Sequence, residues 1–387
     1  MRRAPILFFF FLLFFLPSVV QASPPTNELV KQQAEQVGVE SIKQYWDHIV
    51  QQYGGLLPES QKGSFWQFIN GEKQLSLSEW LQAFMKFLLY ELMANGKLLG
   101  TLILLTVFSL FLQSLQNAFS HHAVSKVAHA VVYMVLMIIA LNSFHVAVTY
   151  VKEAIQTMTS FMIALLPILL ALMASSGGVV SVAFFHPIVL FFMNITGTII
   201  EHFSLPLLFL ATILSIVSLL SEHYKVTKLA DLLRNISIGS LGVMLTIFFG
   251  VLSIKGATTA IADGIAIRAA KFVAGNFIPI IGRMFTDAAD TVVTASVLLK
   301  NTVGLFGVTL LLLIAAFPAI KILVIALIYQ LAAAILQPMG GGIVISCLSV
   351  ISKSMMYVLT ALLIVSLMFF LSMTVIIAAG NLTMMVR

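Results

Sequence analysis

Charged residues are scarce in this chain. They make up 9% of its 387 residues, whereas 60% of the residues are hydrophobic and the mean hydropathy is +1.05. Soluble domains usually carry roughly a quarter charged residues, so the shortage excludes an ordinary soluble protein. Long apolar runs take their place. They predict an all-α fold, namely a polytopic α-helical membrane protein with about seven to nine spans and a small extracytoplasmic N-terminal helical region.

Positive charge is present but not concentrated. The formal net charge is +6, yet the 21 basic residues are scattered singly between apolar runs, without a basic stripe or interleaved aromatic residues. This distribution excludes a nucleic-acid partner. We interpret the charge as a signal for membrane topology, with the lipid bilayer as the surrounding medium.

Cysteine and enzyme motifs are also missing. Cys347 is the only cysteine, which excludes an intramolecular disulfide and a cysteine metal cluster. The sequence has no GxxxxGK[ST] phosphate loop, no HExxH zinc motif and no GxSxG elbow, and its eight histidines lack metal-ligand spacing. We therefore expect no enzyme activity, no catalytic residue, no metal and no cofactor.

The first 22 residues have the features of a cleavable signal peptide. Arg2 and Arg3 precede a short apolar core at 6–16, and small residues lead up to Ala22. We predict cleavage after Ala22. An uncleaved anchor is the alternative, because the core is strongly hydrophobic. In both cases the segment that follows lies outside the cytoplasm.

Residues 23–96 are polar enough to lie in water. Apolar residues recur between Val30 and Tyr53 at steps of mostly three and four, which predicts an amphipathic helix that ends at Gly54. A second helix is expected from Ser76, whose side chain forms a capping box with Glu79. We expect this extracytoplasmic region to pack on the membrane, on itself or on a partner.

Residues 97–387 form the predicted multipass membrane domain. About 20 apolar residues cross a bilayer, and on this basis the candidate spans are 98–119, 127–151, 157–174, 179–200, 205–220, 236–254, 303–336, which can be cut once, and 355–379. With an external N-terminus, the positive-inside rule is obeyed weakly over the first five spans. It then fails, because the basic residues between 255 and 300 fall outside.

Segment 255–301 therefore stands apart as a predicted helical hairpin, either interfacial or re-entrant. Charged residues share stripes on two helices, with a breaker at 276–279 between them. The simplest explanation for Arg283 and Asp287, four residues apart, is a surface ion pair. The candidate residues for contact with a partner or interface are Asp263, Arg268, Lys271, Pro279, Arg283, Asp287 and Asp290.

Two interruptions follow in the long apolar run. Pro318 and Lys321 lie in an otherwise apolar setting, and a lysine at membrane depth usually faces a bundle interior or a wet cavity. A turn between two shorter helices, with Lys321 extended to the interface, is the alternative. The candidate pathway or helix-break residues are Pro318, Lys321, Pro338, Gly340, Gly341 and Gly342, although such breaks also permit close helix packing.

Several long blocks resemble one known family. They are GNFIPIIGRMFTDAADTVVTASVLLKNTVGL at 275–305, FPAIK at 317–321, LQPMGGG at 336–342, SLMFFLSMTVIIAAGNLTMMVR at 366–387 and QQYGGLLP at 51–58. On these blocks and on its overall length, the chain resembles the stage III sporulation protein AE family of endospore-forming bacteria.

The resemblance implies a multipass protein of the mother-cell membrane that surrounds the forespore. It implies an assembly with the other stage III A sporulation proteins and, through them, with stage II sporulation protein Q, as a transenvelope channel needed for late forespore development. A separate subunit, stage III sporulation protein AA, is the family's ATPase. We expect a channel or export-platform subunit, with self-association open. A secondary transporter with a site near Pro318 and Gly340, or a purely structural scaffold, is the alternative.

Overall fold

The computed structural model describes residues 38–55, 57, 67, 77–118, 122–220, 225–277, 281–339 and 342–385. The predicted signal peptide with its cleavage site after Ala22 lies outside these residues. Pro279, Gly340 and Gly341 lie outside them as well. The expectations for these positions stay predictions.

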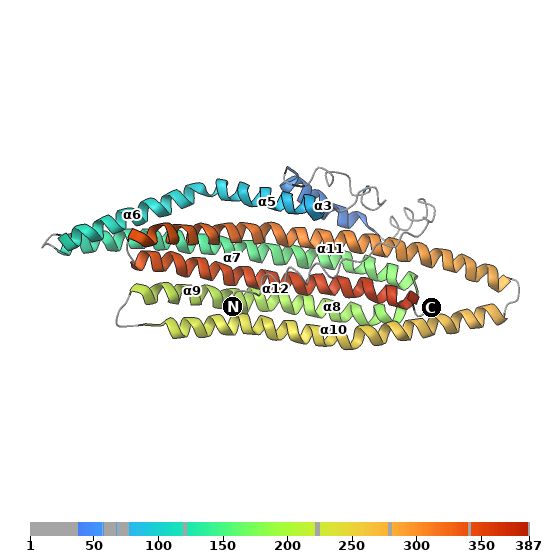
Figure 1. Cartoon of the computed structure of the whole chain (residues 1–387). Coiled ribbons are helices and arrows are strands. Elements are labelled where there is room, and N and C mark those ends of the chain that lie inside the picture. The colour runs from blue at the N-terminus through green and yellow to red at the C-terminus, as the bar shows by residue number, and fades with distance from the viewer. Residues whose placement is uncertain are drawn as a thin grey trace.

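Long helices make up the described part of the chain, in which no strand occurs. Figure 1 shows them side by side as a bundle of rods of unequal length. The main elements are α7 (His122–Ser175), α8 (Val179–Ile199) continued by the π-helix η2 (Ile200–Ser204) and by α9 (Leu205–Leu220), α10 (Thr227–Phe277), α11 (Ile281–Leu336) and α12 (Ile343–Met385). The predicted all-α fold is confirmed.

These helices are longer than a bilayer is thick. At 1.5 Å per residue, the 54 residues of α7 extend about 80 Å, against about 30 Å for a hydrocarbon core. In the described ranges, five helices are long and apolar enough to cross a membrane, or six if the bent pair 78–94 and 96–112 counts as one span. The chain is a polytopic membrane protein, but the predicted seven to nine spans are not confirmed.

The count differs because predicted spans merge. Spans 127–151 and 157–174 both lie in α7, and spans 179–200 and 205–220 both lie in the rod formed by α8, η2 and α9. Polar residues interrupt the hydropathy pattern at 152–156, but Lys, Glu and Gln are good helix formers. No glycine or proline separates the two halves of α7 at this point. The apolar pattern is therefore interrupted at 152–156, whereas the helix continues through these residues.

The predicted helix break at Pro318 is not present. α11 continues through Pro318, just as α7 continues through Pro167. A proline removes one backbone hydrogen bond, but a helix tolerates this loss where neighbouring helices pack around it. A later interruption does occur. The 3₁₀ helix η3 (Gln337–Met339) follows α11, and α12 begins directly after Gly342.

Segment 255–301 is built from the ends of two bundle helices. α10 runs without a break to Phe277, and α11 begins at Ile281. Figure 1 shows these two helix ends extending beyond the ends of α7 and α12. The two arms of the predicted hairpin are thus extensions of long rods. Their position relative to the membrane stays a prediction.

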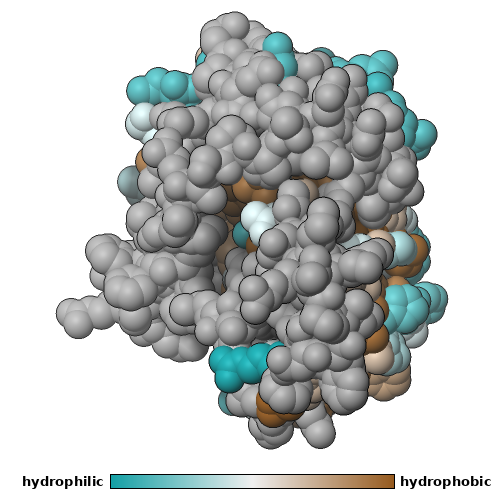
Figure 2. Space-filling model, turned by 90° about the vertical axis from the view of Figure 1, so that its right-hand side faces the viewer, coloured by the Kyte–Doolittle hydropathy of each residue, from teal (hydrophilic) through white to brown (hydrophobic). Residues whose placement is uncertain are grey.

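The centre of the bundle is formed by α7, α11 and α12, each of which contacts the other two. Phe144 and Phe161 of α7, Tyr329 of α11 and Phe369 of α12 are almost completely buried. The Tyr329 hydroxyl donates a hydrogen bond to Ser143 Oγ at 2.9 Å. Viewed from the right-hand end of Figure 1 (Figure 2), hydrophilic and hydrophobic residues among those described lie together at the margin, and hydrophobic residues also line the hollow near the centre.

Three helices from the N-terminal part cover one side of this centre (Figure 1). They are α3 (Glu40–Tyr53), α5 (Leu77–Ala94) and α6 (Gly96–Ala118). α5 and α6 meet at an angle of 44°. α3 is amphipathic, and its buried side consists of Ile42, Trp46, Ile49 and Tyr53. The N-terminal helices therefore belong to the same packed body as the membrane helices.

Candidate functional site

Lys321 lies beside aromatic rings from two other helices. It lies on α11, one turn after Pro318, and is partly buried. Its Nζ is 5.6 Å from the centre of the Tyr53 ring in α3 and 5.2 Å from the centre of the Tyr150 ring in α7. A lysine at this distance is attracted by the quadrupole of the ring. The structure thus gives Lys321 an aromatic environment.

Tyr53 forms part of this environment. It is 8% exposed, and its ring stacks on Phe317 with centres 3.8 Å apart and an interplanar angle of 6°. The edge of Phe87 packs against it at 5.9 Å. Burial raises the pKa of Tyr53 to about 12, and the negative charge of Glu91 adds to the shift. Tyr53 is therefore neutral at ordinary pH, and Lys321 faces a ring and not a phenolate.

A second charged site lies on another face of α7 at nearly the same level. Lys152 Nζ is 2.5 Å from Oε1 of Glu201, which belongs to η2. Gln156 Nε2 donates to the two carboxylate oxygens of Glu201 at 3.4 and 3.3 Å. The side chains of Lys152 and Glu201 are 47% and 30% exposed. This ion pair connects α7 to the middle of the next rod.

An open cleft of about 230 Å³ surrounds the ion pair, with walls from α7, α8 and η2. We call it the α7–α8 cleft. Its polar lining consists of Lys152, Gln156, Thr159, Ser160, Asn194, Thr198, Glu201 and His202. π-Helices are rare in proteins, and those that do occur are often found at functional sites. A larger cleft of about 310 Å³ lies between α11 and α12 and is lined by Ala326, Leu327, Gln330, Ser352, Lys353, Met356 and Tyr357.

Lys152 and Glu201 are not among the functional residues predicted from the sequence. Both were treated as ends of apolar spans, because spans of about 20 residues were fitted to the hydropathy pattern. The signal that was available is that each residue lies near the middle of a continuous apolar stretch, at 130–175 and 179–219. An ionisable residue within such a stretch is a functional candidate.

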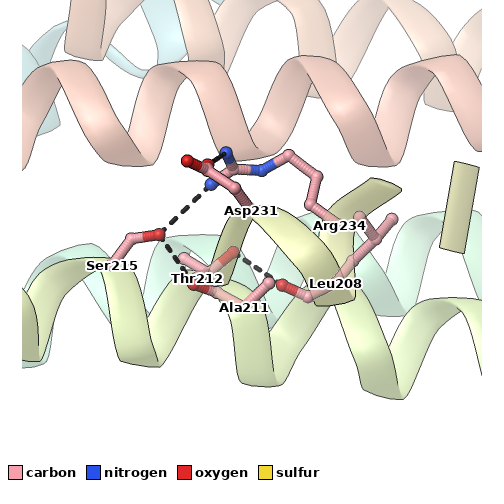
Figure 3. Close-up of polar contacts among 6 residues, drawn as sticks. All are labelled: Leu208, Ala211, Thr212, Ser215, Asp231 and Arg234. Carbon is pink, nitrogen blue, oxygen red and sulfur yellow. Dashed lines mark hydrogen bonds and ion pairs between the residues drawn. The ribbon is translucent and has the colours of Figure 1, made fainter. Parts of the chain in front are cut away.

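A third polar cluster joins α9, α10 and α12. Figure 3 shows Arg234 of α10 reaching across to Ser215 of α9. Its guanidinium donates to Asp231 Oδ1 at 2.7 Å and to Ser215 Oγ at 3.2 Å. The same guanidinium lies 4.8 Å from the centre of the Tyr357 ring. Because Arg234 is 15% exposed and its bonds are all within the chain, this cluster holds three helices together.

Asp263, which the sequence made a candidate for contact with a partner or interface, lies inside the protein. It is 1% exposed, and its carboxylate accepts the backbone N–H groups of Val180 at 2.7 Å and Ser181 at 3.0 Å. Gly178 precedes α8 and provides no side-chain cap. Asp263 of α10 therefore caps the start of α8. A stripe pattern cannot reveal this role, because the acceptor and the donors are far apart in sequence.

The turn between α7 and α8 depends on glycine. Gly177 has a φ of +93°, a value that L side chains rarely adopt. A Cβ at Gly178 would lie 2.8 Å from Met173 Cγ and 3.1 Å from the Met173 carbonyl oxygen. Both glycines thus allow the tight corner that presents the N–H groups of α8 to Asp263.

The other predicted residues are placed less completely. Arg268 is exposed on α10, and Pro338 is exposed in η3. The Gly342 carbonyl accepts the N–H of Ser346 at 3.2 Å, in the first turn of α12. Lys271, Arg283, Asp287 and Asp290 lie in helical backbone, and their side chains are outside the described set. Their proposed contacts stay predictions.

Lys300 is a buried charge that is not among the functional residues predicted from the sequence. It is fully buried on α11, and its Nζ donates to the carbonyl oxygen of Ile377 in α12 at 3.1 Å. A Cβ at Gly304 would meet the Ile377 side chain at 2.6 Å. Glycine therefore permits α11 and α12 to approach closely beside Lys300.

No group of three or more His, Cys, Asp or Glu residues within the described ranges is arranged to hold a metal ion. The polar sites are instead built from ion pairs, amides, hydroxyls and aromatic rings. These groups bind by hydrogen bonding and electrostatic attraction.

Comparison with known proteins identifies the family. Residues 60–380 match the family described as Stage III sporulation protein AE. The chain is 64% identical over 360 residues to "Stage III sporulation protein AE" of Bacillus subtilis (strain 168), which covers 93% of this chain and 90% of that protein. No solved structure matches the chain. The sequence-based prediction of the family is confirmed, and the chain belongs to the stage III sporulation protein AE family.

Proposed function

We propose that the chain is a channel or export-platform subunit of a transenvelope complex that links mother cell and forespore. Membership of the stage III sporulation protein AE family gives it a role in sporulation. In the proposal it lies in the mother-cell membrane around the forespore, with residues 23–96 extracytoplasmic after removal of residues 1–22. Its partners are the other stage III A proteins and, through them, stage II sporulation protein Q.

The observation that carries the proposal is the ion pair in the middle of apolar rods. A helix that only anchors a protein needs no charge within its apolar stretch, and an ionisable residue within such a stretch is a functional candidate. Here Lys152 and Glu201 come from two different rods and meet in an open cleft. A subunit that handles polar molecules or polar partners within the membrane accounts for this arrangement.

Energy for transport comes from another subunit in this proposal. The sequence contains no GxxxxGK[ST] loop. We therefore propose that the chain has no enzyme activity of its own and acts by forming part of the route.

The proposal is tested by complementation in Bacillus subtilis that lacks its own stage III sporulation protein AE. A tagged copy of this chain is expected to restore heat-resistant spores and to co-purify with the other stage III A proteins and with stage II sporulation protein Q. Spore formation restored without any co-purification would contradict it, and would favour a free-standing transporter or scaffold.

One pair of variants sharpens this test. Glu201→Gln removes the charge that pairs with Lys152, whereas Glu153→Gln makes the same change at an exposed neighbouring position that does not line the cleft. We expect Glu201→Gln to reduce the spore count and Glu153→Gln to leave it unchanged. Equal spore counts for both variants would separate the ion pair from the function.

A further inference from the structure

The α7–α8 cleft opens to the outside of the bundle. Gln156 and Ser160 of α7 are exposed, as are Asn194 and Thr198 of α8 and His202 of η2. These side chains offer amide, hydroxyl and imidazole groups to whatever surrounds the protein. The cleft is therefore not a closed polar pocket whose groups satisfy one another.

Apolar surface lies next to the cleft on the same helices. Ile163 is 46% exposed one turn after Ser160, and Phe191 is 59% exposed one turn before Asn194. On the other side of η2, Leu210 is 46% exposed. The two rods that form the cleft are apolar stretches of 46 and 41 residues. A short polar strip thus interrupts surfaces that otherwise suit lipid.

Lipid cannot satisfy such a strip. Hydrocarbon offers no hydrogen bonds, so exposed polar and ionised groups in membrane helices face protein or water. The π-helix strengthens the argument, because it places Glu201 beside Lys152 and His202 in the cleft. Such local widening of a helix is common at functional sites.

Gly197 keeps the cleft open. It lies in the lining, and among the described residues the nearest atom that a Cβ would meet beyond the adjacent backbone of its own helix is Thr159 Oγ1, at 4.0 Å. A methyl group therefore fits, whereas a larger side chain would occupy the cleft itself.

We propose that the α7–α8 cleft is filled with water and lines a passage for small polar solutes without net charge. The charges of Lys152 and Glu201 cancel, so the lining favours neither sign of ion. Amides and hydroxyls can donate to and accept from a neutral or zwitterionic solute. The inference rests on the proposed function, because the passage belongs to the assembled complex.

Cysteine accessibility in membrane vesicles of both orientations tests the proposal. Single cysteines replace Ser160, Asn194 and Thr198 in the cleft, with Ile163→Cys, Phe191→Cys and Leu210→Cys as matched controls. The buried native Cys347 serves as the unreactive background. The probe is a charged, membrane-impermeant methanethiosulfonate. We expect the cleft cysteines to react at least about tenfold faster than the controls, because the reactive thiolate forms poorly away from water.

Two results would overturn the proposal. Cleft cysteines that react as slowly as the controls, with or without cross-links between copies, would mean that lipid or protein fills the cleft. Controls that react as fast as the cleft cysteines would mean that this level of the bundle lies outside the bilayer.

A plugging variant gives an independent measurement. Gly197→Leu should slow the labelling of Asn194→Cys about tenfold, and Gly197→Ala should leave it within about twofold. Unchanged labelling with Gly197→Leu would contradict the geometry. Both measurements are made on vesicles that contain this chain alone and on vesicles with the other stage III A proteins. A hydrated cleft without co-purification would therefore contradict the proposed membership of the complex but not the proposal that the α7–α8 cleft holds water.

Discussion

A lysine lies beside each of two faces of α7, and the two lysines are stabilised within the apolar helices in different ways. On one face, Tyr150 and Tyr53 cover the ammonium of Lys321 with aromatic rings. On the other face, Lys152 pairs with Glu201 in an open cleft. The first site is partly covered by a helix from the N-terminal region, and the second is open to the outside. A charged residue within apolar helices can therefore be held in at least two ways, by stacking on aromatic rings or by an ion pair in an open cleft.

The difference assigns different roles to the two sites. The aromatic site ties α3 to α7 and α11, so its residues should contribute mainly to stability. The open cleft contributes little packing and should matter mainly for function. Four changes to these two sites test this division.

Tyr53→Ala should destabilise the protein most. It removes a buried ring that stacks on Phe317, and aromatic-to-alanine changes of this kind cost about 3–5 kcal/mol. The thermal unfolding midpoint of the purified chain in detergent measures the effect. Tyr53→Phe is the control and should retain most of the stability. A Tyr53→Ala protein as stable as the native chain would show that α3 does not cover the site.

Alkaline pH should weaken the same site through the Tyr53 hydroxyl. Its pKa is about 12 in the folded protein and about 10 in an unfolded chain. The stability linked to the neutral phenol is fully present below about pH 10 and is lost as the pH rises toward 12. By pH 11 the native chain should have lost about 1 kcal/mol more than Tyr53→Phe. Parallel pH curves for the two proteins would count against a buried phenol.

Lys321→Met should have a smaller effect. It removes a cation–π contact worth about 0.5–2 kcal/mol but leaves an apolar side chain of similar length between the rings. We expect a loss of stability at the low end of that range and a normal spore count. A strong loss of spores at unchanged stability would return Lys321 to the pathway and reverse the comparison.

The Lys152–Glu201 pair should show the smallest effect on stability. Partly exposed ion pairs contribute about 0.2–1 kcal/mol. A double-mutant cycle with Lys152→Met and Glu201→Gln measures the coupling free energy from unfolding midpoints. The spore count should nevertheless fall for each single variant. Variants that lose stability in proportion to spores would make this site structural as well.

The sequence predicted the class of fold but not the helix lengths. Low charge and long apolar runs indicate a helical membrane protein. The expected end of a helix at Gly54 agrees with α3, which ends at Tyr53. Hydropathy, however, divides α7 at Lys152, and the proline suggested a possible turn in α11 at Pro318. In a packed rod, good helix formers and tertiary contacts carry the helix through both positions.

The candidate site was less predictable because its contacts are distant in sequence. Lys321 was selected from its apolar surroundings, but the rings beside it come from α3 and α7. The residues Gln156 and Glu201 are 45 positions apart, and Asp263 lies 83 positions from Val180. Helical periodicity indicates which face a residue occupies. It contains no information on which other helix lies opposite that face.

The cap on α8 also has a consequence for synthesis. Val180 is synthesised 83 residues before Asp263, whose carboxylate accepts its N–H in the folded protein. During that interval Asp263 is unavailable, and water or another group must satisfy this N–H group. During translation there is therefore a stage in which α7 and α8 have been synthesised but the start of α8 is not yet capped by Asp263. The cap can form only after α10 has been made.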